Sequence, residues 1–164
     1  RRKREAEVLF EAIHTGHSVY ATVHADSISE TIRSLINPPI SVSQNLLTAV
    51  NLNVVMFRDR RKGIRRVYQV GEFVGSDESQ GAIRPNIMYR WSPTEDKIVP
   101  HSTSLRLYDD LGLHTGMSHA EIKNDLLEKE EFLKLMVKRN IRKVNDVGDI
   151  MCKYYINPEK VIKK

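Results

Sequence analysis

The residues whose types and spacing can do chemistry lie in one short segment, residues 15–26. The segment begins Thr15-Gly16-His17 and ends Thr22-Val23-His24-Ala25-Asp26. Residues 18–23 are rich in β-forming types, and alternate side chains of a strand share one face. Thr22 and His24 can therefore reach the same phosphate, where a histidine donates a hydrogen bond to a phosphate oxygen and senses its presence.

Helices on both sides position this segment. Residues 5–14 place apolar side chains at helical spacing, and Gly16 ends that helix. A second helix begins after Asp26 or Ser27 and ends at residues 37–39, Asn-Pro-Pro. Polar residues at the carboxyl end of a strand in an α/β sheet face the usual ligand crevice. Residue types alone leave open the alternative that His24 is structural.

The rest of the chain predicts two hairpins followed by helices. A charged turn at residues 59–63 joins two strands, and a polar, glycine-containing stretch from residue 74 predicts a linker. Ser118 and Glu121 form a capping box at the start of a long helix. The predicted strands are 52–58, 64–73, 86–91 and 97–101, and the predicted later helices are 104–111, 118–139 and 146–155.

Several strings together resemble one protein family. Thr15-Gly16-His17, residues 22–26, Asn37-Pro38-Pro39-Ile40 and the strand Arg65–Glu72 are similar to the stretch that follows the Walker B motif in secretion and pilus-assembly ATPases. These enzymes form the type II/type IV secretion superfamily, and the likeness is to its archaeal branch, which includes pilus and archaellum assembly. The resemblance covers residues 1–73 well. The tail resembles archaeal members more loosely.

This resemblance implies an α/β fold. Residues 1–73 would form the C-terminal portion of a RecA-like P-loop NTPase core that carries the histidine box. Residues 74–85 would be a linker, and residues 86–164 a small hairpin followed by a helical C-terminal subdomain.

The resemblance also implies roles for individual residues. His24 is the histidine-box sensor of the γ-phosphate, supported by Thr22 and Asp26. Thr15, Gly16 and His17 form the turn that shapes the nucleotide side. An arginine of the family corresponds to Arg2 or Arg4, and the choice stays open because Lys3 stands where a glycine is usual.

The family's members are hexameric motors that hydrolyse ATP with Mg²⁺ to drive protein export or filament assembly. By this resemblance the chain's partners are other copies of itself and a membrane platform protein. Its location is cytoplasmic, with peripheral association at the cytoplasmic membrane face. The candidates for subunit contacts are Arg60, Arg61, Arg65 and Arg66.

Two alternatives compete with the motor. In one, the helical part from Ser102 onward is a non-enzymatic module that docks on a membrane platform or adjacent subunits. In the other, the basic turn 58–66 makes the chain a nucleic-acid-binding domain. The acidic residues of the long helix argue against nucleic acid, which we therefore do not expect as a partner; they are Glu128, Glu130 and Glu131.

Composition narrows the remaining classes. The net charge is +5 and the sequence pI is about 9.4, with basic runs at residues 1–4 and 58–66, which suits anionic partners. Cys152 is the only cysteine, so an intrachain disulfide or a cysteine zinc cluster cannot form. His14 and His17 are separated by Gly16, so we expect no metal site. No apolar stretch approaches the roughly 20 residues of a membrane helix.

The sequence contains no phosphate-binding loop. The chain has 8 glycines, and none of them directly precedes a lysine. The loop that cradles phosphate ends in Gly-Lys-Ser/Thr, and the acidic Walker B strand is not in the chain either. Phosphoryl transfer depends on that lysine, on Mg²⁺ and on its carboxylate. We therefore expect a piece of a longer ATPase that neither binds nucleotide tightly nor hydrolyses it alone.

Overall fold

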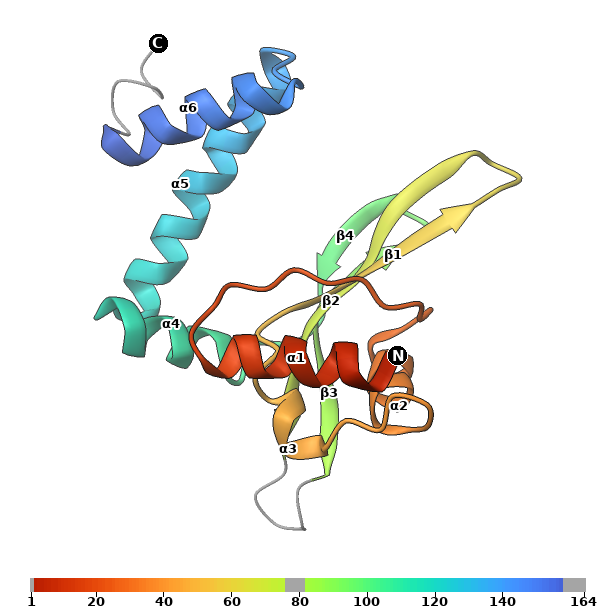
Figure 1. The fold of residues 1–164 in the computed structure, drawn as a ribbon. Coiled ribbons are helices and arrows are strands. Elements are labelled where there is room, and N and C mark those ends of the chain that lie inside the picture. The colour runs from red at the N-terminus through yellow and green to blue at the C-terminus, as the bar shows by residue number, and fades with distance from the viewer. Residues whose placement is uncertain (1, 76–81, 158–164) are drawn as a thin grey trace. The chain divides into compact units, whose positions relative to one another are not determined.

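The computed structural model describes residues 2–75 and 82–157, and its fold is mixed α/β (Figure 1). The chain divides into two compact units, residues 1–110 and residues 111–164, which we describe separately. The first unit contains the sheet and three helices that share its core. The second unit is helical.

The sheet is antiparallel throughout, and each strand pairs with the next along the chain. Register shifts after Val55 and after Val70 mark bulges, which change the side chains that face the helices. The order in the sheet is β1 (Asn53–Asp59), β2 (Ile64–Gly75), β3 (Ile83–Ser92) and β4 (Lys97–Pro100).

A carboxylate holds the turn between β1 and β2. Asp59 Oδ1 accepts hydrogen bonds from the backbone amides of Arg61 at 2.8 Å and Lys62 at 3.2 Å. Gly63 follows with φ 66°, a left-handed conformation that glycine adopts without a Cβ penalty. The predicted hairpin is thereby confirmed, with strand ends within two residues of those expected.

Helices α1 (Arg2–His14), α2 (Ile28–Ile36) and α3 (Gln44–Leu47) share one hydrophobic core with the sheet. Each large apolar side chain that is fully buried contributes about 1.5–3 kcal/mol, so this cluster is the main source of stability in the first unit. Its buried members are Phe10, Ile28, Ile32, Leu35, Val42, Leu47, Val55 and Phe73.

Gly71 of β2 packs closely against Ile28 of α2. A Cβ at this position would lie 2.7 Å from Ile28 Cδ1 and 3.1 Å from Ile87 Cα, and it would overlap the carbonyl oxygen of Asn86. The bulge at this point therefore depends on a residue without a side chain.

The second unit is a helical hairpin built from α5 (His119–Lys138) and α6 (Val144–Ile156). The predicted capping box of α5 is confirmed, since Ser118 and Glu121 bond each other's backbone amides. Phe132 stacks on Tyr154 with ring centroids 4.3 Å apart, and Met136 completes the small buried core. Helix α4 (Leu107–Thr115) spans the boundary between the two units.

The strand predicted at residues 18–23 does not form. These residues are extended but belong to no sheet, because a strand needs a second backbone to accept its hydrogen bonds. The strands of the described residues pair among themselves in antiparallel order. The parallel RecA-like core expected within residues 1–73 is therefore not what the described residues form.

Other boundaries differ in smaller ways. Of the residues predicted as a linker, Val74 pairs with Arg84 and Gly75 with Ile83, so β2 and β3 continue into this stretch. Residues 76–81 lie outside the described residues. The helix predicted at 104–111 runs from Leu107 to Thr115, because the residues before it are bound to the sheet by polar contacts described below. None of the described helices has the length and apolar character that crossing a membrane requires.

The close packing at Gly71 gives a stability prediction. Gly71→Ala should lower the free energy of unfolding by about 3 kcal/mol, because the new methyl group collides with backbone that cannot move without breaking the sheet. Urea denaturation followed by circular dichroism measures this change. Gly75→Ala on the same strand is the control, since among the described residues its Cβ would meet only Thr48 Cγ2, at 3.9 Å. Equal stability of the two variants would contradict the packing argument.

Candidate functional site

The predicted turn at residues 15–17 is a helix C-cap. The amide of His17 donates to the carbonyl of Ala12 and the amide of Gly16 to that of Ile13, both at 3.0 Å. With Gly16 at φ 83°, this is the Schellman arrangement that ends a helix. Thr15 Oγ1 also lies 3.0 Å from His17 Nδ1, so these two predicted residues are brought together.

Beyond this turn, residues 18–25 run as an exposed, extended segment. Tyr20 is 98% exposed and Val23 is 42% exposed. Neither backbone nor side-chain hydrogen bonds join residues 18–25 to any other residue that the structure describes. Thr22 and His24 are both exposed on this segment. No hydrogen bond or ion pair joins either side chain to another predicted site residue within the described ranges.

The segment ends at the N-terminus of α2. Ser27, rather than Asp26, is the N-cap, because Ser27 Oγ accepts from the amide of Glu30 at 3.1 Å. The amide of Asp26 donates to Glu30 Oε2 at 2.9 Å. The amide of Ile28 donates to Gln69 Oε1 of β2 at 3.0 Å, in a buried position. His24 thus lies four residues before the first residue of α2, whose amide is bound to the sheet.

The two candidate arginines lie at the start of α1. Arg4 is exposed, and it makes no ion pair with another described residue. For Arg2 the structure describes the backbone alone. No group of three potential metal ligands occurs among residues 2–75 and 82–157.

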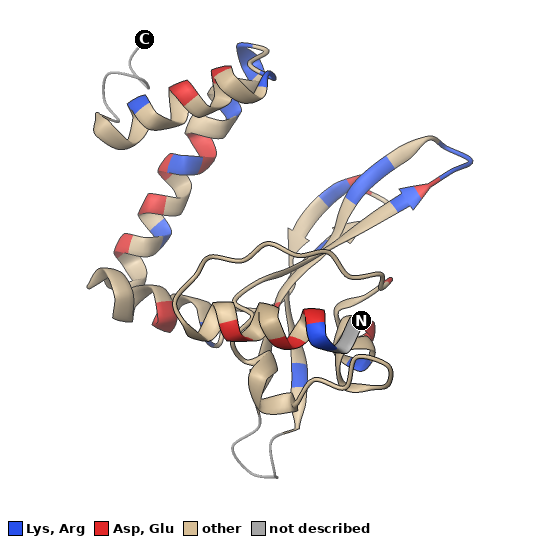
Figure 2. Ribbon diagram, in the orientation of Figure 1, with Lys and Arg blue, Asp and Glu red and all other residues tan. Residues whose placement is uncertain are grey.

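The arginines proposed for subunit contacts lie on a protruding arm formed by β1 and β2. Figure 2 shows blue residues gathered at the end of this arm, away from the helices α1, α2 and α3 of the same unit. Arg60, Arg61 and Arg65 are exposed, but Arg66 is engaged within the chain. Arg66 donates to both carboxylate oxygens of Asp96, at 2.6 and 2.5 Å.

Asp96 joins this pair to an aromatic cluster. Hydrogen bonds donated by Arg66 and by Trp91 Nε1 hold the pKa of Asp96 near 2, well below its ordinary value of 3.8. The indole of Trp91 stacks on Phe57 with centroids 5.3 Å apart, and Phe57 also contacts Tyr68. Arg90 lies over the Tyr68 ring, 5.8 Å from its centroid. These interactions join β1, β2 and β3 to one another and to the turn before β4, and they fix the base of the arm.

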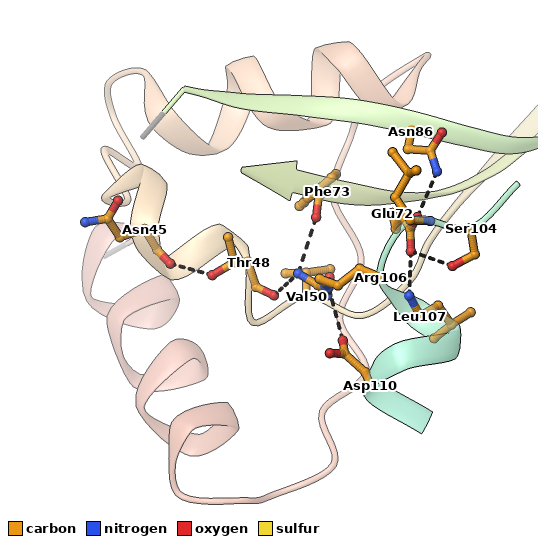
Figure 3. Close-up of polar contacts among 11 residues, drawn as sticks. Asn45, Thr48, Val50, Glu72, Phe73, Asn86, Ser104, Arg106, Leu107 and Asp110 are labelled. Carbon is orange, nitrogen blue, oxygen red and sulfur yellow. Dashed lines mark hydrogen bonds and ion pairs between the residues drawn. The ribbon is translucent and has the colours of Figure 1, made fainter. Parts of the chain in front are cut away.

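The buried carboxylate of Glu72 binds the loop between β4 and α4 to the sheet through a network of hydrogen bonds (Figure 3). Glu72 of β2 has no exposed surface. Its oxygens accept hydrogen bonds from Asn86 Nδ2 at 2.8 Å, Ser104 Oγ at 3.1 Å and the backbone amides of Leu105 and Leu107 at 2.5 and 2.9 Å. Burial raises the pKa of Glu72, but these four donors together outweigh it and lower the pKa below its ordinary value of 4.5.

Arg106 also binds this loop to the rest of the unit, and we call the two residues the Glu72–Arg106 anchor. Its guanidinium donates to the carbonyls of Thr48, Val50 and Phe73, and its Nε lies 3.1 Å from Asp110 Oδ2. One side chain thus holds the residues after α3, the end of β2 and the start of α4 together.

Sequence reasoning missed the Glu72–Arg106 anchor. A carboxylate inside the apolar run Val70–Val74 was the available signal, because an unpaired charge cannot be buried there. Nothing in the local sequence indicates Arg106, whose acceptors lie 33 to 58 residues away along the chain. The anchor is structural, and nucleotide chemistry would have to come from residues 15–26.

Comparisons with known proteins give relatives but no family. No protein family matches the chain. Three uncharacterized proteins of Methanocaldococcus jannaschii are similar to it. MJ1287 is 33% identical over 139 residues, 84% of this chain and 51% of that protein. MJ0900 is 30% identical over 161 residues, 94% of this chain and 29% of that protein. MJ0781 is 28% identical over 144 residues, 87% of this chain and 20% of that protein. The chain therefore spans between a fifth and about half the length of these relatives.

The buried carboxylate gives a prediction with a defined pH dependence. Glu72→Gln should lower the free energy of unfolding at pH 7 by about 2–3 kcal/mol. The new side-chain NH2 group cannot accept hydrogen bonds, so buried donors that now bind that carboxylate oxygen would be left without an acceptor. Glu95→Gln, an exposed change in the turn after β3, should change stability little. Urea denaturation of all three proteins measures the difference.

The pH dependence follows from the lowered pKa of Glu72. A depressed pKa stabilises the fold above the unfolded-state value, and this contribution is lost as the pH falls through the folded-state value. The wild-type advantage over Glu72→Gln should therefore be complete at pH 7 and shrink below about pH 4.5. An advantage that stays constant down to pH 3 would contradict the assigned ionisation of Glu72.

Proposed function

We propose that this chain is the C-terminal part of a hexameric ATPase that powers protein secretion or the assembly of pilus-like filaments. The observation that carries the proposal is the segment at residues 18–25. It is rich in β-forming residues, extended and free of hydrogen bonds to any described residue, and it ends in Thr22, His24 and Asp26.

The extended, unpaired backbone of this segment supports the proposal that it pairs with a strand outside this chain. An extended backbone with unpaired amides and carbonyls is stable within a sheet and costly outside one, unless water satisfies it. Tyr20, at 98% exposure, is a large side chain that a sheet flanked by helices would cover. We infer that residues 18–24 join a parallel, RecA-like sheet whose other strands belong to a longer protein. The relatives, which are two to five times longer than their matched regions, are consistent with this size.

The position of His24 supports its role as a phosphate sensor. In a paired strand, Thr22 and His24 would share one face at the strand's carboxyl end. The N-terminus of α2 follows within four residues, and it is fixed to β2 through Gln69. A donor on a fixed backbone stabilises charge on a transferring phosphate without reorganisation. Thr15, Gly16 and His17 would form the adjoining turn, and Arg2 or Arg4 would supply positive charge.

The rest of the machinery is proposed to lie in the longer protein. A phosphate-binding lysine and a magnesium-binding carboxylate would come from its preceding segments, so ATP and Mg²⁺ would bind there. Six copies would form the motor at the cytoplasmic face of a membrane, next to a platform protein.

One observation favours docking as a second candidate function. Helix α5 exposes Leu126, Leu133 and Val137 at 44%, 52% and 74%, on the side next to its buried residues. These positions form a short apolar stripe at helical spacing. As an interaction module, the second unit would bind a platform protein through this stripe, with or without hydrolysis elsewhere.

The test uses the complete reading frame that contains this chain. We expect the full-length protein to contain Gly-Lys-Ser/Thr upstream and to hydrolyse ATP, and the 164-residue chain alone to show no turnover. His24→Ala in the full-length protein should lower the hydrolysis rate roughly 100-fold, the usual loss for one donor to transition-state charge. His101→Ala, at an exposed site in the same unit, should leave the rate unchanged.

Two results would contradict the proposal. One is a full-length protein without a phosphate-binding loop, which would favour the docking module instead. The other is ATP hydrolysis that His24→Ala does not slow.

A further inference from the structure

The end of the β1–β2 arm carries a cluster of cations that nothing in the described structure neutralises. We call it the cationic tip. Its side chains are exposed, and none of them is within ion-pair distance of a carboxylate among residues 2–75 and 82–157. Its members are Arg58, Arg60, Arg61, Lys62 and Arg65.

Charge repulsion within the cationic tip destabilises the fold. Arg58 lies directly opposite Arg65 in the register of β1 and β2, and like charges at facing positions repel. The only acid of the turn, Asp59, has one oxygen occupied by the amides of Arg61 and Lys62. Such repulsion is relieved when an anionic surface binds, which indicates a binding role for the tip.

The arm presents the tip on a fixed base. Phe57 stacks on Trp91, and Trp91 shares Asp96 with Arg66. These contacts tie β1 and β2 to β3 and to the turn before β4. Because the base is ordered before any partner arrives, binding through the tip costs little conformational entropy.

The side chains next to the tip indicate that the partner is a protein. Val54 and Met56 of β1 are 50% and 63% exposed, and they lie between the tip and the body of the unit. Arginine and methionine are enriched in protein interfaces and lysine is depleted, and the tip holds four arginines and one lysine. Phosphate-rich surfaces such as nucleic acid or lipid headgroups would leave Val54 and Met56 in water.

A complementary surface lies on α1 of the same unit. Glu7 and Glu11 are one helical turn apart on the exposed side, with Val8 between them at 57% exposure. Neither carboxylate pairs with another described residue, and like charges four residues apart destabilise a helix. The surface combines an exposed aliphatic group with acids that pair with no described residue, which matches the cations and Met56 of the arm.

The tip does not reach this surface within one chain. The arm extends away from α1, α2 and α3, and the blue residues at its end are distant from the red residues of α1 (Figure 2). We infer that the cationic tip of one chain docks on Glu7, Val8 and Glu11 of a second copy. The contact joins two different surfaces, so it repeats from chain to chain, as a ring or a linear array requires. This inference rests on the proposed function in one respect, because it assigns a contact between subunits of the proposed hexamer.

The test measures self-association of the 164-residue chain without nucleotide, by sedimentation equilibrium at about 50 mM salt, where charge screening is weak. Arg60→Glu with Arg61→Glu reverses two charges of the tip, and Glu7→Lys with Glu11→Lys reverses both charges of the helix surface. Each double variant should raise the dissociation constant for self-association by roughly tenfold or more, as expected when charges in a contact are reversed. A chain with all four substitutions should regain association, because the charges are complementary again.

The control pair is Lys138→Glu with Lys153→Glu, two exposed positions in the second unit, which should associate like the wild type. Circular dichroism confirms that every variant is folded. The inference is overturned if the fourfold variant associates no better than the double variants. It is also overturned if Arg60→Glu with Arg61→Glu leaves self-association unchanged but abolishes binding to phosphatidylserine vesicles or to duplex DNA. No nucleotide is present, so neither result depends on the role of His24.

Discussion

The ionised carboxylate of Glu72 is the constraint on which the first unit depends. It lies without exposed surface in the middle of the sheet, where a charge is stable only when donors surround it. Two of its donors are backbone amides at the start of α4, so the carboxylate fixes where that helix begins. Arg106, between those amides, reaches in the opposite direction to the residues after α3. Glu72 and Arg106 thus join the sheet, the loop and the helix through hydrogen bonds, which fix direction as apolar packing cannot.

Interactions between close neighbours in the chain could be predicted from the sequence. Gly16 ends α1, Ser118 caps α5, and the charged turn at residues 59–63 forms a hairpin, because each depends on bonds within a few residues. The start of α4 could not be predicted, since it is set by Glu72, which lies more than thirty residues earlier. The close approach at Gly71 has the same origin, because the atoms it avoids come from α2 and β3.

The segment at residues 18–25 shows a different limit of sequence reasoning. Val19, Tyr20 and Val23 are typical of a strand, yet their backbone forms no hydrogen bond with any described residue. Strand formation depends on a second backbone, which local composition cannot supply. Of the candidate site, the turn at Thr15 and His17 is assembled, whereas Thr22 and His24 remain on an exposed segment. The cationic tip and the acids of α1 likewise pair with no other described residue. Both the segment and the charged surfaces agree with our proposal that this chain works as part of a larger assembly.

The proposed nucleotide site depends on the proposed pairing of residues 18–24 with strands of a longer protein. Amide hydrogen exchange followed by mass spectrometry reports it directly, because amides in a central strand exchange far more slowly than unpaired ones. We expect the peptide covering Val19–Val23 to exchange within seconds in the 164-residue chain and to be protected by orders of magnitude in the full-length protein. Fast exchange of the same peptide in a folded, full-length protein would contradict the strand and the phosphate-sensing role of His24 with it.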